Sequence, residues 1–313
     1  MLRRIVEWFF RGESDQWLSI LRVGLGVQVL LNLFALRHDW SSFVGGIAHP
    51  LLSRDLSEAL LSLESSLIPR LGWFVWAGKQ AGISEPLILQ MCWYFLAALS
   101  VLMLVGLFCR ASAAGVWFVH LCVVKSGGFL SYGVDALTTT GLFYLMLSPL
   151  PDRFSLDHLW CNKPTVDPER LGFWRRVLQL HLCLIYLFSG LTKALGRGWW
   201  DGINLWRALI RPPFDLVRPA LLVHFRYILP IASIAVVLLE LGYPLFIWQP
   251  RLRQTWLIGV LLMHIAIGLA MGMYLFALVM IVLNLAAFAP DVLWQGRQRA
   301  ALSPVVPDSL SVA

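Results

Sequence analysis

The chain has 313 residues, of which 58% are hydrophobic and 14% are charged, and its formal net charge is +7. Soluble domains contain about 25% charged residues. This composition, with a mean hydropathy of +0.72, therefore excludes an ordinary soluble domain and indicates an integral membrane protein. The positive charge follows from orientation in a membrane, where basic residues gather on one side. No nucleic-acid-binding motif is visible, so we expect the lipid bilayer, and no nucleic acid, as a partner.

Residues 1–16 are interrupted by charges such as Arg4, Glu7 and Arg11, so they cannot supply the apolar core of a cleavable signal peptide. Aromatic residues between these charges, among them Trp8, favour an amphipathic helix that lies on the inner membrane face.

Residues 17–290 contain the apolar runs that are long enough to cross a bilayer, which needs about 20 residues. The candidate spans are Trp17–Leu36, Pro86–Phe108, the shorter Ala111–Val124, Val134–Leu150, Val177–Leu195 and Tyr227–Trp248. Residues 256–289 lack charge and are too long for one span, so we expect a reversal near Met271-Gly272-Met273. The sequence predicts an all-α, polytopic membrane helix bundle with about eight transmembrane helices and a cytoplasmic tail, residues 291–313.

The short loops Cys109-Arg110 and Gln249–Gln254 are basic, which predicts a multi-pass protein with both termini in the cytoplasm, in a bacterial inner membrane. In the outer loop 196–226, Asp201 is a good N-cap for an amphipathic interfacial helix at Ile203–Ile210. No internal repeat or second soluble domain is visible in the sequence.

Lys193 lies near the outer end of an apolar run, and Asp135 starts the preceding span. An ionisable residue inside a span is a functional candidate, and antiparallel neighbours place these two at similar depth. A stripe of polar and small residues, including Tyr186 and Gly190, shares the Lys193 face. The alternatives stay open: Lys193 can reach the headgroups, as Arg22 is expected to do, and Asp135 can cap its own helix.

Glu240 and His264 are predicted to lie at one depth on neighbouring helices, so we expect them to pair. The pair is either structural or handles a proton or ligand. Trp199 and Trp200 follow Lys193 and are typical of an interfacial aromatic belt, although a binding cage stays possible.

The five cysteines are scattered without a Cys-x-x-Cys pattern, so no metal site is expected. No Gly-rich phosphate loop, zinc-protease motif or serine-hydrolase motif is present.

The stretch His181–Lys193, followed by Gly198-Trp-Trp-Asp-Gly202, resembles the HTTM (horizontally transferred transmembrane) family, the membrane portion shared with vitamin K-dependent γ-carboxylases. Three further segments agree with the family over roughly residues 10–290. These segments are Tyr132–Ala136, Asp152–Asp157 and His264–Phe276.

The resemblance implies that Lys193 is a base that deprotonates a reduced quinone, with Glu240 and His264 at matching acidic and histidine positions. Where the carboxylases have a catalytic-site histidine, this chain has Asp135, and their large lumenal domain has no counterpart here.

Two hypotheses follow. In the first, a membrane enzyme acts on a quinone or another lipid-soluble small molecule, with Lys193 as base, Asp135 tuning it, and Tyr186, Trp199 and Trp200 lining the site. In the second, the protein is non-catalytic and serves as a small-molecule or proton pathway, or as an immunity or assembly factor.

Overall fold

The computed structural model describes residues 2–40, 54–127, 132–161 and 167–302, and within these ranges it contains helices and no strand. The all-α prediction is confirmed. The long helices are α2 (Gln16–Ala35), α6 (Glu85–Val105), α7 (Cys109–Ser126), α8 (Gly133–Leu147), α10 (Pro168–Leu195), α13 (Ile228–Phe246), α14 (Arg253–Met271) and α15 (Tyr274–Leu302). The short elements are α1 (Leu2–Phe9), α4 (Arg54–Glu64), α5 (Leu71–Gln80), α9 (Leu156–Cys161), the 3₁₀ helix η1 (Arg197–Trp199), α11 (Ile203–Ile210) and α12 (Pro219–His224).

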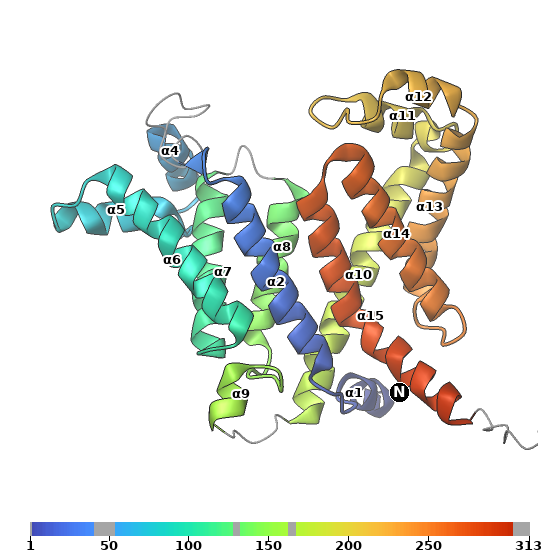
Figure 1. Cartoon of the computed structure of the whole chain (residues 1–313), viewed down its shortest axis with the longest axis horizontal. Helices are drawn as coiled ribbons and strands as arrows, with labels where there is room; N and C mark the ends of the chain where they lie inside the picture. Colours follow the sequence, from blue (N-terminus) through green and yellow to red (C-terminus); the bar gives the residue numbers. More distant parts are fainter. Residues whose placement is uncertain (1, 41–53, 128–131, 162–166, 303–313) are drawn as a thin grey trace, which may run out of the picture.

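Six of the described helices are long and apolar enough to cross a membrane: α2, α6, α10, α13, α14 and the first part of α15. Helix α8 is a shorter apolar helix, and α7 packs between α6 and α8. Figure 1 shows these helices running side by side. The arrangement fits a multi-pass membrane protein. The sequence predicted about eight transmembrane helices, and the six candidates together with α7 and α8 account for that number among the described residues.

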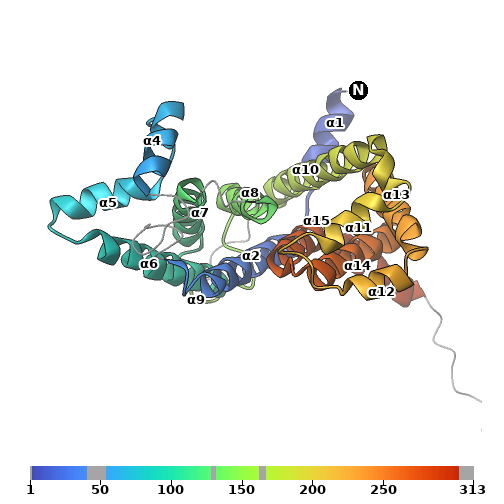
Figure 2. The same cartoon turned by 90° about the horizontal axis from the view of Figure 1, so that it is seen from above.

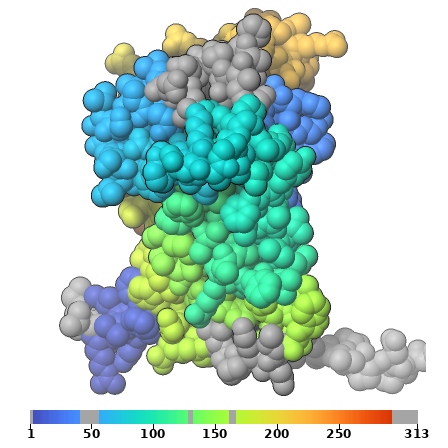
Figure 3. Space-filling view, turned by 90° about the vertical axis from the view of Figure 1, so that its left-hand side faces the viewer, coloured from blue at the N-terminus to red at the C-terminus, as the bar shows by residue number. Residues whose placement is uncertain are grey.

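The outer surface of the bundle is apolar, as a lipid-facing surface must be. On the side formed by α5, α6 and α7 (Figure 3), more than half of the surface of Leu87, Met91, Tyr94 and Phe95 is exposed. A large exposed apolar area of this kind is unusual for a soluble monomer. The bilayer is therefore the natural environment of this face.

The short helices gather at the two ends of the bundle. Helices α4, α5, α11 and α12 lie at one end, and α1 and α9 lie at the other (Figure 1). Helix α11 has the predicted bounds, and the Asp201 carboxylate accepts a hydrogen bond from the Ile203 N–H at 2.9 Å. The sequence did not predict α4, α5, α9 or α12.

The reversal predicted near Met271-Gly272-Met273 is confirmed. Helix α14 ends at Met271, and Gly272 adopts a left-handed conformation with φ of 70° before α15 begins at Tyr274. A side chain at this φ would be strained, and glycine adopts it freely. One residue thus divides the apolar run into two antiparallel helices.

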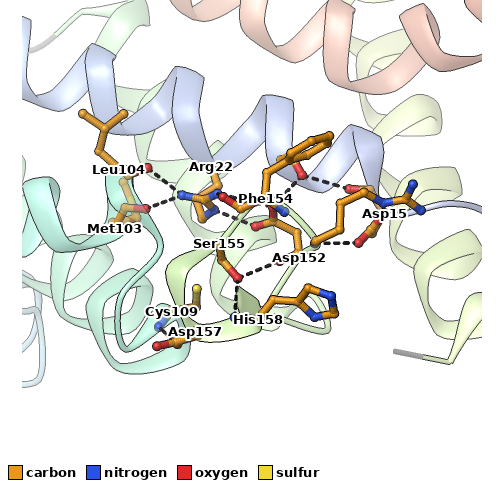
Figure 4. Close-up of polar contacts among 12 residues, drawn as sticks. Asp15, Arg22, Met103, Leu104, Cys109, Asp152, Phe154, Ser155, Asp157 and His158 are labelled. Carbon is orange, nitrogen blue, oxygen red and sulfur yellow. Dashed lines mark hydrogen bonds and ion pairs between the residues drawn. The ribbon is translucent and has the colours of Figure 1, made fainter. Parts of the chain in front are cut away.

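Arg22 does not reach for the headgroups, so that prediction is wrong. Its side chain is 1% exposed and forms an ion pair with Asp152, at 2.6 Å between Nε and Oδ2. The guanidinium also donates to the carbonyl oxygens of Met103, Leu104 and Phe154 (Figure 4). A guanidinium presents five N–H donors, and three carbonyls and a carboxylate use them here. The chain that follows α8 is therefore fastened to α2 and to the end of α6.

The orientation stays a prediction, and cysteine labelling can test it. Cys161 is first replaced by serine, because the other four native cysteines are buried. A cysteine at the exposed Ser66, between α4 and α5, should then react with an impermeant maleimide from outside intact cells. A cysteine at the exposed Gln254 should react only after the cells are opened. The reverse pattern would contradict cytoplasmic termini.

Candidate functional site

Lys193 occupies the last turn of α10, and its ammonium points at a carboxylate inside the bundle. Its Nζ lies 2.7 Å from Glu240 Oε2 on α13, and it donates to Ser189 Oγ at 2.6 Å. The two charged side chains are 20% and 8% exposed. The Nζ also lies 5.4 Å from the ring centroid of Trp199, within the range of a cation–π interaction. Lys193 is thus a partner in a largely buried ion pair and not a headgroup anchor.

Gly190 explains how α10 and α13 come close enough for this pair. A Cβ at Gly190 would lie 2.8 Å from the backbone nitrogen of Leu241 and 3.0 Å from Glu240 Cβ. Small residues of this kind let helix backbones approach in membrane bundles. The position of Glu240 beside Lys193 therefore depends on the missing side chain of Gly190.

Replacing Gly190 with alanine should push α13 away from α10 and destabilise the protein by about 1–3 kcal/mol, as overpacking does. Gly259→Ala is the control, because its added methyl would meet only the flexible end of Leu239, at 3.1 Å. Thermal unfolding in detergent compares the two variants. Equal midpoints would show that the close approach at Gly190 is not required.

A second group of polar side chains lies one to two turns farther along the same face of α10. Tyr186 and His264 are hydrogen-bonded at 2.8 Å between the hydroxyl and Nε2, and Asn284 donates to the Tyr186 hydroxyl at 2.8 Å. Tyr243 donates to Asn284 Oδ1 at 2.7 Å. All four are buried, and they come from four different helices, α10, α13, α14 and α15. His264 Nδ1 has no partner in the described part of the chain.

Two pairings expected from the sequence are wrong. Glu240 pairs with Lys193, and His264 pairs with Tyr186, so Glu240 and His264 do not form the predicted pair. Asp135 is not the partner of Lys193: its carboxylate accepts the Tyr132 N–H at 3.0 Å and belongs to the capping box that starts α8. Counting residues from helix ends gives depth but not the direction in which each side chain points.

The two tryptophans after Lys193 have different surroundings. The carbonyl oxygen of Trp199 accepts a hydrogen bond from Ser233 Oγ at 2.6 Å, which holds this turn against α13. Trp200 is 45% exposed, and its Nε1 donates to the carbonyl of Ala194. Trp199 therefore belongs to the site, whereas Trp200 covers the end of α10.

Sequence reasoning missed Asn284, Tyr243 and Ser189. A usable signal existed for Asn284, because it is the only asparagine in the uncharged run of residues 256–289. A lone amide in such a run needs hydrogen-bond partners once it is buried in the membrane. No comparable signal distinguishes Ser189 or Tyr243 from neighbouring residues of the same type.

An ionic layer closes the other end of α10. Arg175 pairs with Glu13 at 2.7 Å and with Asp291 at 3.0 Å, and Glu13 also pairs with Arg176 at 2.9 Å. Arg253 adds a longer contact to Asp291, at 3.5 Å. At 1.5 Å per residue, this layer lies about 21 Å along α10 from Ser189. The Lys193–Glu240 pair therefore lies near the opposite end of α10 from this layer.

The arrangement can hold and move a proton, because an amine, a carboxylate, an imidazole and two phenols share one buried region. Two surface hollows lie elsewhere, one beside α12 and one between α1 and Leu180 of α10. Among the described residues, no group of three His, Cys, Asp or Glu side chains could hold a metal ion.

In comparisons with known proteins, no family model, curated protein or solved structure matches the chain.

Proposed function

We propose that this protein is a multi-pass membrane enzyme that removes a proton from the hydroxyl group of a reduced quinone or a related lipid-soluble molecule. The observation that carries the proposal is the largely buried Lys193–Glu240 pair, at 2.7 Å. A charged pair in the interior of a membrane bundle is costly and is typical of a functional site. The resemblance of His181–Gly202 to the HTTM family supports the same reading, because it implies a base at Lys193.

The Lys193–Glu240 pair can accept the proton of the substrate hydroxyl group in two steps. Transfer of one ammonium proton from Lys193 to Glu240 leaves a neutral amine and a neutral carboxylic acid. The amine then takes the proton of the substrate hydroxyl, which gives an ammonium and a bound oxyanion of opposite charge. Low-dielectric surroundings strengthen this attraction. Glu240 thereby takes the tuning role that the sequence assigned to Asp135.

The neighbouring groups have roles that follow from their bonds. Trp199 gives the ammonium an aromatic face at 5.4 Å. Tyr186, held between His264 and Asn284, presents a hydroxyl on the same face of α10. Such fixed hydrogen-bonding groups orient a small molecule in an otherwise apolar site.

A second candidate function is a proton pathway. The polar side chains of α10 continue from Lys193 through Tyr186 to Gln179, which donates to the carbonyl of Ala287, and then to the Arg175 layer. A line of polar groups through a membrane bundle is typical of proton relays. Acidification of vesicles that contain the protein, followed with a pH-sensitive dye, tests this candidate separately.

The enzyme proposal predicts a loss of at least about 100-fold in hydroquinone deprotonation for Lys193→Arg, because a guanidinium keeps its proton. The protein in nanodiscs is mixed with a reduced isoprenoid naphthoquinone, and oxygen consumption is recorded, since the hydroquinone anion reacts with oxygen faster than the neutral form.

Lys79→Arg is the matched control. Lys79 also pairs with a glutamate, Glu85, at 2.7 Å, but its side chain is 52% exposed on α5. Lys79→Arg should keep the wild-type rate. If Lys193→Arg also kept it, Lys193 would not be the base and the enzyme proposal would fail.

A further inference from the structure

The order of the helices repeats within the chain. In the described residues, the first series of α-helices is one short helix (α1), one long helix (α2), two short helices (α4, α5) and three long helices (α6, α7, α8). The second series has the same order, α9, α10, α11, α12, α13, α14 and α15, with the 3₁₀ helix η1 added between α10 and α11. In both series the pair of short helices lies at the same end of the bundle (Figure 1). Seen from above, α6 to α8 lie on one side and α10, α13 and α14 on the other (Figure 2).

The packing inside the two series is also the same. Helix α2 packs against α6 and α8, as α10 packs against α13 and α15. Helix α7 contacts α6 and α8, as α14 contacts α13 and α15. The two sets are joined where α15 packs against α2 and α8. We call α1 to α8 the first copy and α9 to α15 the second copy.

A sequence match lies on the third long helix of each copy. His120 lies four residues after the pair Gly115-Val116, and His264 lies four residues after Gly259-Val260. Both histidines are buried, at 2% and 3% exposed. Each is bonded to a hydroxyl, of Thr139 at 3.2 Å and of Tyr186 at 2.8 Å, and each keeps one ring nitrogen without a partner in the described residues.

A second match closes the same end of each copy. Arg22 of α2 pairs with Asp152, and Arg175 of α10 pairs with Asp291. Both arginine side chains are 1% exposed, and both aspartates directly follow a proline, Pro151 beyond α8 and Pro290 inside α15. In each copy a buried arginine of the first long helix is thus paired with an aspartate, which follows α8 in the first copy and lies within α15 in the second.

These matched residues fix the register between the copies. Leu33 lies eleven residues after Arg22, as Tyr186 lies eleven residues after Arg175. Leu96 lies 24 residues before His120, as Glu240 lies 24 residues before His264. Seven residues before the aspartates lie Leu145 and Asn284. All six side chains are buried. Three leucines of the first copy thus correspond to three polar residues of the second, and these three all belong to the candidate site.

We infer that the bundle is an internal duplication of one four-helix unit, in which the second copy alone carries the reactive cluster. Glu240 and Asn284 then serve the chemistry and are not needed for folding, because leucine fills the same positions in the first copy. This inference rests on the proposed function and names the residues that set its specificity.

The test is a variant with an apolar interior in the second copy. Glu240→Leu and Asn284→Leu introduce the residue of the first copy, and Lys193→Met and Tyr243→Phe remove the remaining charge and hydroxyl group. Tyr186 is kept because its bond to His264 survives these changes. Buried ion pairs are often replaced by apolar residues without loss of stability. The variant should insert normally, melt within about 5 °C of the wild type, and lose hydroquinone deprotonation.

The surface pair provides the matched control, because Lys79→Met with Glu85→Leu also removes a lysine and a glutamate. If the cluster variant aggregated or melted more than about 10 °C lower while this control stayed folded, the polar residues would serve folding and the inference would be overturned. A cluster variant that folded and kept its deprotonation rate would overturn the assignment of the chemistry to these residues. A wild type without hydroquinone activity would refute the proposed function, and the melting result would still decide whether the polar residues are needed for folding.

Discussion

Replacing Arg22 with methionine should destabilise the protein by about 3–5 kcal/mol, because the substitution leaves a buried carboxylate without its counter-charge. Asp152 is completely buried, and Ser19 Oγ and the Phe154 N–H are its other hydrogen-bond donors. Three backbone carbonyls would lose their donor as well. Thermal unfolding in detergent should show a midpoint roughly 6–20 °C below that of the wild type.

The neighbouring residue supplies the control. Arg153 forms an ion pair with Asp15, but its side chain is 48% exposed, and surface pairs contribute about 0–1 kcal/mol. Arg153→Met should therefore melt close to the wild type. A similar loss of stability for Arg22→Met and Arg153→Met would mean that burial of the Arg22–Asp152 pair is not what stabilises this end of the bundle.

The sequence predicted the transmembrane elements well because their signal is local. Length and apolarity alone place most long helices, and the amphipathic run at Ile203–Ile210 gives the bounds of α11, although the N-cap is Gly202 and not the predicted Asp201. The length limit of one span placed the reversal at Gly272. Each of these features depends on neighbouring residues in the chain, so no knowledge of packing was needed.

The partners of the buried charges depend on packing between distant segments. Arg22 and Asp152 are 130 positions apart, and Asp152 lies beyond the last residue of α8, outside any apolar run. Lys193 and Glu240 are 47 positions apart. Residue spacing placed Glu240 at the depth of His264 but did not reveal which helix it faces. The sequence therefore identified Lys193, Tyr186, Glu240 and His264 as candidates while assigning two wrong pairs.

The repeat escaped sequence analysis for a related reason. The apolar residues that fill equivalent positions differ in type, and the polar residues of the second copy stand where the first has leucine, as at Leu96 and Glu240. The short match at His120 and His264 gains meaning only when both histidines are seen on the third long helix of their copies. The order and packing of the helices show the relationship first, and the few matching residues then fix the register.

Lys193→Met should cost about 3–5 kcal/mol, and Glu240→Leu should cost less, because the two charges are not equally able to escape burial. Glu240 is 8% exposed and its short side chain cannot reach water from the middle of α13, so it would stay buried without a counter-charge. Lys193 is 20% exposed at the end of α10, keeps Ser189 as an acceptor, and has a long stem that lets its ammonium move outward. Thermal unfolding of both single variants measures this asymmetry.

The double variant Lys193→Met with Glu240→Leu should recover most of the stability lost by Lys193→Met, because no unpaired charge is left in the bundle. Because the double variant recovers most of a loss of about 3–5 kcal/mol, the coupling energy from the complete cycle should be about 3 kcal/mol or more, at the upper end of what residues in direct contact show. Additive losses would show that the two side chains do not interact in the membrane. In that case Lys193 and Glu240 could not share a proton, and the base would have to be found outside this pair.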